Sequence, residues 1–334
     1  MPPIIHAIAD PALTARVVRS LPLLYAKGAD PALDRPAHVR SASGLVRVDG
    51  QIAVIQDDAN FIALIDPATG LARPVTLPAG EGGLRQFDDV RGNKRYKLDL
   101  ESCVTIGDPS GGEMLVAFGS GSTPMREKVV IVRRVASDEP EVRVVDASAL
   151  YAVLRANPDF AGSEMNIEGA VAAAGGLRLF NRGNGAPADG LLPVNATCDL
   201  DLAAFLAYVD DSAAARPPSP RNVAQFDLGA IDGFPLTFTD AAVFGGAILF
   251  AAAAEASPDA THDGPVAGCA IGILRDGDAR YAVVQNADGS RYPGKIEGIL
   301  PEGNDPARLL AVIDRDDPAA PSELLELVLG GDWS

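Results

Sequence analysis

Short apolar segments separated by glycine-containing turns recur along the whole chain. The segments that flank such turns are SGLVRV and QIAVI around Asp49-Gly50, SCVTI and EMLVAF around Gly111-Gly112, GAVAA and LRLF around Gly175-Gly176, and DAAVF and AILFAA around Gly245-Gly246. Gly and Asp accept the positive φ of a tight turn, so each pair of segments predicts a β-hairpin. A fifth hairpin with a longer loop is predicted in KIEGILPEGNDPARLLAVI, from Lys295 to Ile313.

Further strand-like runs follow each hairpin and suggest repeated units. They are FIALID and ARPVTLP, KVVIVRRV and VRVVDAS, CDLDLAAFLAYV and NVAQFDLGAI, and GCAIGILRDG and ARYAVVQN. The fifth unit has only KIEGIL, RLLAVID and SELLELVLG, and TARVVRSLPLL (Thr14 to Leu24) supplies a fourth strand from the N-terminus. Four-stranded units repeated along a chain are typical of propeller blades. We therefore predict an all-β fold with one domain over residues 1–334, a β-propeller of about five four-stranded blades whose N-terminal strand closes the last blade.

Three alternatives stay open at this level. The number of blades is five or six. The same strands also fit two separate β domains, or a β-sandwich with a helical insert near ASALYAVLRANPDF, from Ala147 to Phe160.

Polar residues recur at matching places in the five hairpins. The first strands open with Ser43, Glu101, Glu168, Asp240 and Glu297, each followed by a small residue, and the second strands end with Asp57, Asp58, Ser120, Ser122, Arg182, Asn184, Glu255, Asp314 and Asp316. In an antiparallel hairpin the start of one strand lies beside the end of the next. In a propeller the first strand of each blade lines the axis, so these groups are predicted to surround one mouth of the central channel.

The predicted mouth contains more carboxylates than bases. Carboxylates gathered so closely raise one another's pKa or bind a cation, and calcium, with six to eight oxygen ligands, is the best match. The candidate metal ligands are Glu101, Glu168, Asp240 and Glu297, and the remaining candidate ligand-binding residues are Lys97, Arg126, Arg182, Asn184, Glu255 and Lys295. The basic ones would hold the anionic part of a ligand. The alternative is that Lys97, Arg182 and Lys295 neutralise the ring in a purely structural network of salt bridges.

Two further segments carry candidate chemistry. GSGSTPMREK (Gly119 to Lys128) offers small residues and Arg126 for a backbone anion nest, although it lacks the Gly-Lys-Ser/Thr of a P-loop and an ordinary loop is the simpler interpretation. His262 is the only histidine on the predicted rim, and it or a carboxylate pair such as Glu101 and Glu168 is a candidate for general acid–base work.

Composition narrows the partners. The formal net charge of −17 argues against nucleic acid and against anionic membranes, because both require a positive surface. Cys103, Cys198 and Cys269 lie far apart, without the spacing of a zinc site. Without a signal sequence or a long apolar run, we expect a cytoplasmic, monomeric protein whose partner is a small polar or anionic molecule.

The quoted residues also resemble known propellers. NIEGAV (Asn166 to Val171), KIEGIL and KLDLES (Lys97 to Ser102), together with FNRGN, FTDAAVFGGAILFAAAAE, DGPVAG and IDRDDPAAPSELL, resemble an uncharacterised bacterial β-propeller family and, more loosely, phytase-like or esterase-like propellers. The phytase-like resemblance implies a calcium-assisted phosphoesterase in which Glu101, Glu168 and Glu297 hold metal and Lys97, Arg182 and Lys295 hold phosphate. A similarity to lactonase-type propellers implies a single calcium ion on the axis.

Two functions therefore remain. The first is binding of a small polar or anionic ligand at the charged mouth, with or without a divalent cation such as calcium, and with or without hydrolysis of an ester, phosphoester or lactone. The second is a non-catalytic binding or scaffold propeller with a structural ring of salt bridges. Whether the chain is an enzyme is left open by the sequence.

Overall fold

Antiparallel hairpins form at the five places where the glycine turns predict them. The computed structural model describes residues 2–173, 175–256, 264–303 and 305–333. The paired strands are β5 (Ala42–Val48) and β6 (Gln51–Gln56), β9 (Leu100–Gly107) and β10 (Glu113–Gly119), β13 (Ile167–Ala173) and β14 (Gly176–Asn181), β18 (Phe234–Phe244) and β19 (Ala247–Glu255), and β22 (Ile296–Pro301) and β23 (Arg308–Ile313). The turn residues Asp49 and Gly50 have φ values of 46° and 74°, as a tight hairpin turn requires.

Outer strands extend each hairpin in sequence order. They are β7 (Phe61–Ile65) and β8 (Leu71–Thr76), β11 (Lys128–Arg133) and β12 (Glu141–Asp146), β15 (Asn195–Asp201) and β16 (Arg221–Asp227), β20 (Val266–Arg275) and β21 (Asp278–Gln285), and β24 (Glu323–Gly330). Each of them pairs antiparallel with the strand before it, and the two-residue β17 (Ala230–Ile231) pairs with β18. The protein is therefore an all-β molecule of four-stranded antiparallel units.

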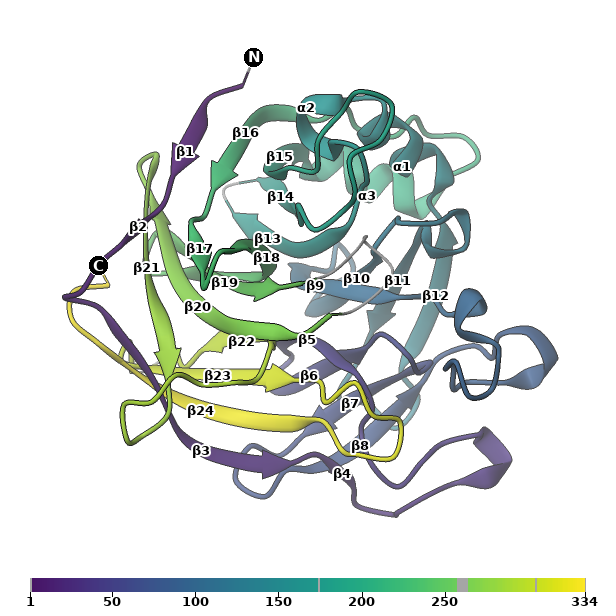
Figure 1. The fold of residues 1–334 in the computed structure, drawn as a ribbon. Coiled ribbons are helices and arrows are strands. Elements are labelled where there is room, and N and C mark those ends of the chain that lie inside the picture. Colours follow the sequence, from purple (N-terminus) through teal and green to yellow (C-terminus); the bar gives the residue numbers. More distant parts are fainter. Residues whose placement is uncertain (1, 174, 257–263, 304, 334) are drawn as a thin grey trace.

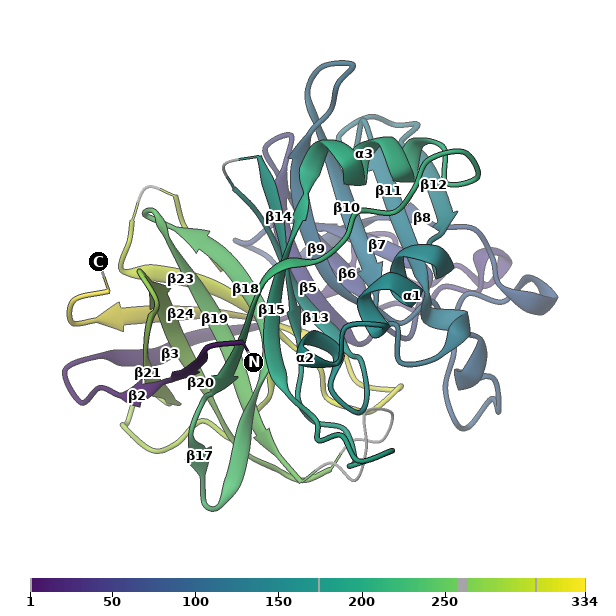
Figure 2. The same cartoon turned by 90° about the horizontal axis from the view of Figure 1, so that it is seen from above.

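The first strands of the units lie together at the centre. β5 contacts β9, β9 contacts β13, β13 contacts β18, β18 contacts β22, and β22 contacts β5. Figures 1 and 2 show these five strands in the middle and the outer strands around them, a propeller-like arrangement. Small residues allow this approach, since a Cβ on Gly298 would lie only 2.7 Å from the Cα of Gly44 on the neighbouring strand.

The N-terminal segment runs along the outside of four units. β3 (Thr14–Pro22) pairs antiparallel with β24, so the predicted N-terminal strand does supply the outer strand of the last unit. On either side, β1 (Ile4–His6) pairs parallel with β16, β2 (Ile8–Ala9) with β21, and β4 (Leu24–Tyr25) with β8. The segment thus covers strand edges that would otherwise be open to pairing with another chain.

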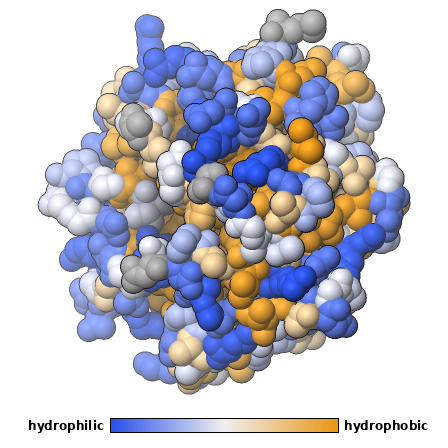
Figure 3. All heavy atoms as spheres, turned by 90° about the vertical axis from the view of Figure 1, so that its left-hand side faces the viewer, coloured by the Kyte–Doolittle hydropathy of each residue, from blue (hydrophilic) through white to orange (hydrophobic). Residues whose placement is uncertain are grey.

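The surface mixes polar and apolar groups. Figure 3 shows one side of the molecule, where hydrophilic residues cover much of the face and apolar residues lie between them. None of the helices in the described part of the chain is both long and apolar enough to cross a bilayer. Cys103, Cys198 and Cys269 are buried and not joined in disulfides.

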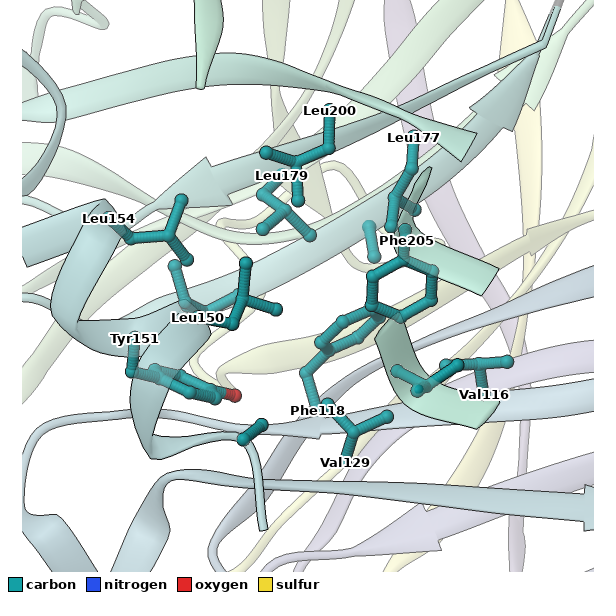
Figure 4. Close-up of a cluster of buried hydrophobic side chains, with 14 of the residues drawn as sticks. Val116, Phe118, Val129, Leu150, Tyr151, Leu154, Leu177, Leu179, Leu200 and Phe205 are labelled. Carbon is teal, nitrogen blue, oxygen red and sulfur yellow. The ribbon is translucent and has the colours of Figure 1, made fainter. Parts of the chain in front are cut away.

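Short helices pack over the second and third units. They are α1 (Ser148–Arg155), α2 (Pro158–Ala161) and α3 (Leu202–Asp210), with 3₁₀ turns η1 (Pro31–Leu33), η2 (Glu81–Gly83), η3 (Lys94–Tyr96) and η4 (Pro124–Arg126) elsewhere. α1 and α2 confirm a helical segment near Ala147–Phe160. Figure 4 shows Leu150 and Tyr151 of α1 and Phe205 of α3 among side chains of β10, β11, β14 and β15, and the rings of Phe118 and Phe205 lie 5.6 Å apart.

One predicted strand is wrong in its second half. CDLDLAAFLAYV was expected to be a single strand, but β15 ends at Asp201 and α3 begins immediately after it. The Asp201 side chain accepts a hydrogen bond of 2.9 Å from Ala204 N and caps the helix, and the Ala- and Leu-rich residues that follow favour helix. Apolar side chains from this helix then fill the cluster of Figure 4.

Candidate functional site

Each central strand carries a β-bulge near its start. The pairing of each first strand with its second strand skips one residue, namely Ser43, Glu101, Glu168, Thr239 and Glu297. A bulge turns the extra side chain away from the regular alternation of the strand and is common beside functional sites. The same structural position of five units is therefore occupied by two hydroxyl residues and three glutamates.

The position of the bulge shows that the predicted alignment of the fourth unit with the other units was wrong by one residue. Thr239, not Asp240, is the residue that matches the three glutamates, and Asp240 occupies the position of Gly44, Ser102, Gly169 and Gly298. Asp240 Oδ2 accepts a hydrogen bond of 2.7 Å from Ile299 N on the next central strand. Burial, which outweighs this bond, raises the pKa of Asp240 well above its usual value.

The hydroxyl residues at the bulges also join neighbouring units. Ser43 Oγ donates to Leu100 O of β9 at 2.5 Å, and Thr239 Oγ1 donates to Ile296 O of β22 at 2.7 Å. Both hydroxyls are buried. The bulged residues of the first and fourth units therefore hold adjacent central strands together.

A small polar cavity of about 50 Å³ lies at this end of the central strands. Its described lining consists of Ser41, Ala42, Ser43, Asp57, Lys94, Lys97, Asp99, Glu101, Arg126, Asn166, Glu168, Arg182, Asn184, Lys295, Glu297, Asp314 and Asp316. We call this set the polar mouth. It contains seven carboxylates and five bases, and its volume suits an ion or a few water molecules.

One group of charges is centred on Lys97. Its Nζ lies 2.5 Å from Asp57 Oδ1, 3.1 Å from Asp58 Oδ1 and 2.7 Å from Asp99 Oδ1. Burial alone would lower the pKa of Lys97, but the three carboxylates outweigh it and raise that pKa well above the usual value. Arg126 Nη1 adds a second contact to Asp99 Oδ2 at 3.0 Å. Lys97 is therefore charged and already engaged by protein carboxylates.

A second group of charges joins the third, fourth and fifth units. Arg182 contacts Glu168 at 3.2 Å and Glu255 at 2.6 Å, and Lys295 contacts Glu255 at 3.3 Å and Glu297 at 2.7 Å. Burial raises the pKa of Glu297 to about 8, against the opposing charge of Lys295. The pKa of Glu255 falls to about 2 instead, because Lys295 and Arg182 together overcome its burial.

Glu101 lies between these two groups and belongs to neither. Among the described residues it forms no hydrogen bond and no salt bridge. Burial raises its pKa well above the usual value, and the charges of Asp57, Asp99 and Glu168 add to that effect while Lys97 opposes it. A further positive charge beside Glu101 would therefore favour its ionised form.

Asp57, Asp99 and Glu101 offer a place for that charge. One carboxylate oxygen from each lies within 4.8 Å of the others. Oxygens bound to the same calcium ion are up to about 5 Å apart, since each Ca–O distance is about 2.4 Å. The three residues thus have the spacing and chemistry of a hard-cation site.

Comparison with known proteins places the chain in a family but assigns it no activity. The model of a family of unknown function (DUF6929) matches residues 38–329. The chain belongs to this family. The expected membership of an uncharacterised family is thereby confirmed. No curated protein matches the sequence.

Solved structures give low similarities. A glutaminyl cyclase from Myxococcus xanthus has 10% identity and a TM-score of 0.47, with 98% of this chain and 99% of that chain covered. The α-L-arabinofuranosidase PaAbf62A from Podospora anserina has 13% identity and a TM-score of 0.45, with coverage of 97% and 98%. A GH93 α-L-arabinofuranosidase from Fusarium graminearum has 8% identity and a TM-score of 0.42, with coverage of 93% and 97%.

Most of the predicted site residues meet in the polar mouth. Those among its lining are Lys97, Glu101, Arg126, Glu168, Arg182, Asn184, Lys295 and Glu297. Glu255 lies behind them on Arg182 and Lys295, and Asp240 faces β22. Of the four predicted metal ligands, only Glu101 belongs to the three-carboxylate cluster found in the described part of the chain.

Asp99 is the main residue that sequence reasoning missed. It precedes Glu101 by two positions, as Ser41, Asn166, Thr237 and Lys295 precede the bulged residues of the other units. The alternation of side chains along a strand, applied backwards from Glu101, would have found it. Its φ of 56° and its buried contacts to Lys97 and Arg126 were not readable from the sequence.

The loop from Gly119 to Lys128 does not form the anion nest that was considered for it, in agreement with the simpler interpretation of an ordinary loop. Ser120 N donates to Asp99 O, Gly121 N to Arg126 O, and Ser122 N to Ser120 Oγ, so these three amides are already used. Arg126 Nη1 is likewise engaged by Asp99 and by Ser122 Oγ. His262, the predicted histidine candidate, lies outside the described residues.

Proposed function

We propose that the chain is a closed five-bladed β-propeller that binds one divalent cation, calcium by preference, in its polar mouth. The ring of contacts from β5 through β9, β13, β18 and β22 back to β5 supports the closure, as does the antiparallel pairing of β3 with β24. A propeller places its first strands around the axis, where residues of all units can meet one ligand.

The cluster of Asp57, Asp99 and Glu101 carries this proposal. Lys97 and Arg126 leave Glu101 without a contact, although they neutralise Asp57 and Asp99 in part. A cation bound by one oxygen from each residue would supply the missing charge and lower the pKa of Glu101. Glu168 and Glu297 differ from Glu101 in that Arg182 and Lys295 contact them directly.

The bound cation would in turn hold a small polar ligand. Calcium takes six to eight oxygen ligands, so three carboxylates leave positions for water, a hydroxyl or an anionic oxygen. Lys97, Arg126, Arg182 and Lys295 already contact carboxylates, so an anionic ligand would be attracted chiefly by the metal. The cavity of about 50 Å³ admits only one such group at a time.

Calorimetric titration with Ca²⁺, Mg²⁺ and Mn²⁺ after removal of metals with EDTA tests the proposal. We expect the wild type to bind Ca²⁺ and to melt at a higher temperature in its presence. At a Ca²⁺ concentration one hundred times Kd, the free energy of unfolding should rise by about 2.7 kcal/mol. Glu101→Gln should weaken binding at least tenfold. Glu141→Gln, a change at the exposed first residue of β12, is the matched control and should bind like the wild type. A wild type that binds none of these ions would contradict the proposal.

A structural ring of salt bridges makes a different prediction for the same variants. If the charges only lock the blades together, no cation changes the melting temperature of any variant. Glu101→Gln then stabilises the protein slightly, because it removes one charge from among Asp57, Asp99 and Glu168. The two functions are therefore distinguished by whether a cation changes the melting temperature, and not by whether the substitution does.

Hydrolysis of an ester, phosphoester or lactone is the second candidate. Lys295 contacts two glutamates with opposite properties, Glu255 with a pKa of about 2 and Glu297 with a pKa of about 8. A carboxylic acid that stays protonated at neutral pH and lines the cavity can donate a proton to a leaving group. The resemblance to phytase-like propellers agrees with cation-assisted chemistry of this kind.

Turnover assays test the second candidate. We expect measurable hydrolysis of p-nitrophenyl phosphate, p-nitrophenyl acetate or a δ-lactone in the presence of Ca²⁺, with a rate that falls above about pH 8 as Glu297 loses its proton. Glu297→Gln should reduce the rate by 10²–10⁴-fold while Ca²⁺ binding persists. Binding of Ca²⁺ without turnover of any of these substrates would contradict the proposed hydrolase activity and would still agree with the proposed binding function.

A further inference from the structure

A second cavity, much larger than the first, lies toward the other end of the same central strands. Its volume is about 790 Å³. One residue from each central strand contributes to its wall two positions after the bulge, namely Leu45, Cys103, Ala170, Ala241 and Ile299. The five strands therefore carry polar side chains at one end and apolar side chains at the other.

The size and the lining of this cavity are those of a ligand site. Small-molecule pockets are commonly 300–1,000 Å³ and mostly apolar. Ala170 and Ala241 are short, so the strands surround space instead of filling it, and Trp333 closes part of the wall from the C-terminal segment. An apolar cavity is a poor site for water, because water needs two to four polar partners.

Two arginines line the cavity without a carboxylate partner. Arg47 and Arg275 form no salt bridge with any described residue, and Arg275 Nε is buried without a hydrogen-bond partner while its Nη2 donates to Gly245 O at 3.4 Å. Glu302 and Asp332 are carboxylates of the same lining, and neither is within salt-bridge distance of Arg47 or Arg275. In this respect the two arginines differ from the bases of the polar mouth, because Lys97, Arg126 and Arg182 all form salt bridges with carboxylates.

We propose that this cavity binds an amphiphile with an apolar body and a single carboxylate, of the long-chain fatty acid class. The apolar body packs against the five central strands and Trp333, which removes its surface from water. The carboxylate meets Arg47 and Arg275, whose planar guanidinium groups suit its two oxygens. The inference does not depend on the cation site, which is formed by other residues at the other end of the strands.

The single tryptophan of the chain provides a direct test. Trp333 is 4% exposed and lies in the cavity wall, so it can transfer excitation energy to cis-parinaric acid bound beside it. We expect saturable, one-to-one sensitised emission from parinaric acid and a matching loss of Trp333 emission. Parinaric acid methyl ester has the same apolar body without the charge and should bind at least tenfold more weakly.

Variants separate the head group from the apolar body. Arg47→Gln with Arg275→Gln should weaken binding of the acid at least tenfold and leave binding of the methyl ester unchanged. Arg73→Gln, at an arginine of the outer strand β8, is the matched control and should change neither. Glu302→Gln should strengthen binding of the acid, because it removes a like charge from the lining. Ala242→Phe narrows the cavity and should weaken both ligands, with circular dichroism used to verify its fold.

The results that would overturn the proposal are specific. If the acid and the ester bind with equal affinity, and the double arginine variant binds them as the wild type does, then the two arginines do not recognise a carboxylate and the proposal is wrong. Emission that rises without saturation, or that is unchanged by Ala242→Phe in a folded protein, would show that parinaric acid binds elsewhere and would remove the cavity as its site.

Discussion

At the bulged position, a single residue decides what each unit contributes to the polar mouth. Ser43 and Thr239 donate hydrogen bonds to neighbouring strands, whereas Glu101, Glu168 and Glu297 bring carboxylates. The three glutamates differ in their neighbours. Arg182 contacts Glu168, Lys295 contacts Glu297, and Glu101 has acids on both sides. Their capacity to hold a proton or a cation therefore follows from packing and not from their place in the repeat.

Asp240 has a structural role that substitution can reveal. Asp240→Ala leaves the buried Ile299 N–H without its acceptor, and we expect a loss of about 1–3 kcal/mol in the free energy of unfolding. Asp240→Asn retains an acceptor oxygen and should lose less. Urea denaturation measures both variants. Neither should change the affinity for Ca²⁺, and a large loss of affinity with the fold intact would restore Asp240 as a metal ligand.

Glu297 predicts how stability depends on pH. Its pKa is about 8 in the folded protein and near 4.5 when unfolded, so the folded state binds the proton more tightly. Its stabilising contribution is complete below about pH 4.5 and is lost as the pH rises toward 8, by at most about 1.4 kcal/mol per pH unit. Denaturation of the wild type and Glu297→Gln in EDTA, from pH 5 to pH 8, should show the wild type losing stability relative to the variant as the pH rises, because glutamine resembles the neutral acid and does not titrate. A constant difference would show that Glu297 does not titrate in this range.

At the scale of elements, the N-terminal segment connects four of the five units from outside. β1 and β2 cover the edges of β16 and β21, and β3 completes the unit of β24. Because the segment bridges units that are far apart in sequence, it restrains them relative to one another. Its contribution is therefore larger than its few strand pairs alone suggest.

Deletion of residues 1–12 tests this contribution. It removes β1 and β2 and leaves β3 in place, so we expect a folded protein with a lower melting temperature, by roughly 2–4 °C for each kcal/mol lost. Freed edges on β16 and β21 should also promote association, which light scattering detects. An unchanged melting temperature with no association would mean that the two short strands add nothing to the fold.

At the scale of the whole molecule, the contact of β22 with β5 joins the last unit to the first. Because of this contact, the last unit is not a free end from which unfolding can spread, so we expect the units to lose structure together. Two separate β domains, the alternative that the sequence left open, would unfold independently.

Coincidence of two signals tests cooperative unfolding. Trp333 reports on the C-terminal unit, and far-ultraviolet circular dichroism reports on all strands. We expect one transition with the same midpoint in urea by both methods, at a molecular mass by gel filtration near 34.5 kDa for a monomer. Separate midpoints would instead indicate two domains, and a larger mass would indicate an oligomer.

The sequence by itself determined the strands and their grouping. Glycine turns with positive φ, apolar runs of strand length and the spare strand Thr14–Leu24 are local signals, and the structure has a hairpin or an outer strand at each of them. The gathering of polar residues at one end also followed, because antiparallel pairing puts strand starts beside strand ends. α3 was missed because an apolar Ala- and Leu-rich run of that length fits a helix or a buried strand equally well.

Only the tertiary structure decided which of those polar residues act together. A bulge adds one residue to a strand and turns every later side chain to the other face, so the register at Thr239 and Asp240 depends on pairing with β19 and not on the local sequence. The separation of Glu101 from Lys97, and the apolar cavity beyond the bulges, likewise result from how five strands approach one another. Charge partners and empty space are properties of residues distant in sequence, which no local pattern specifies.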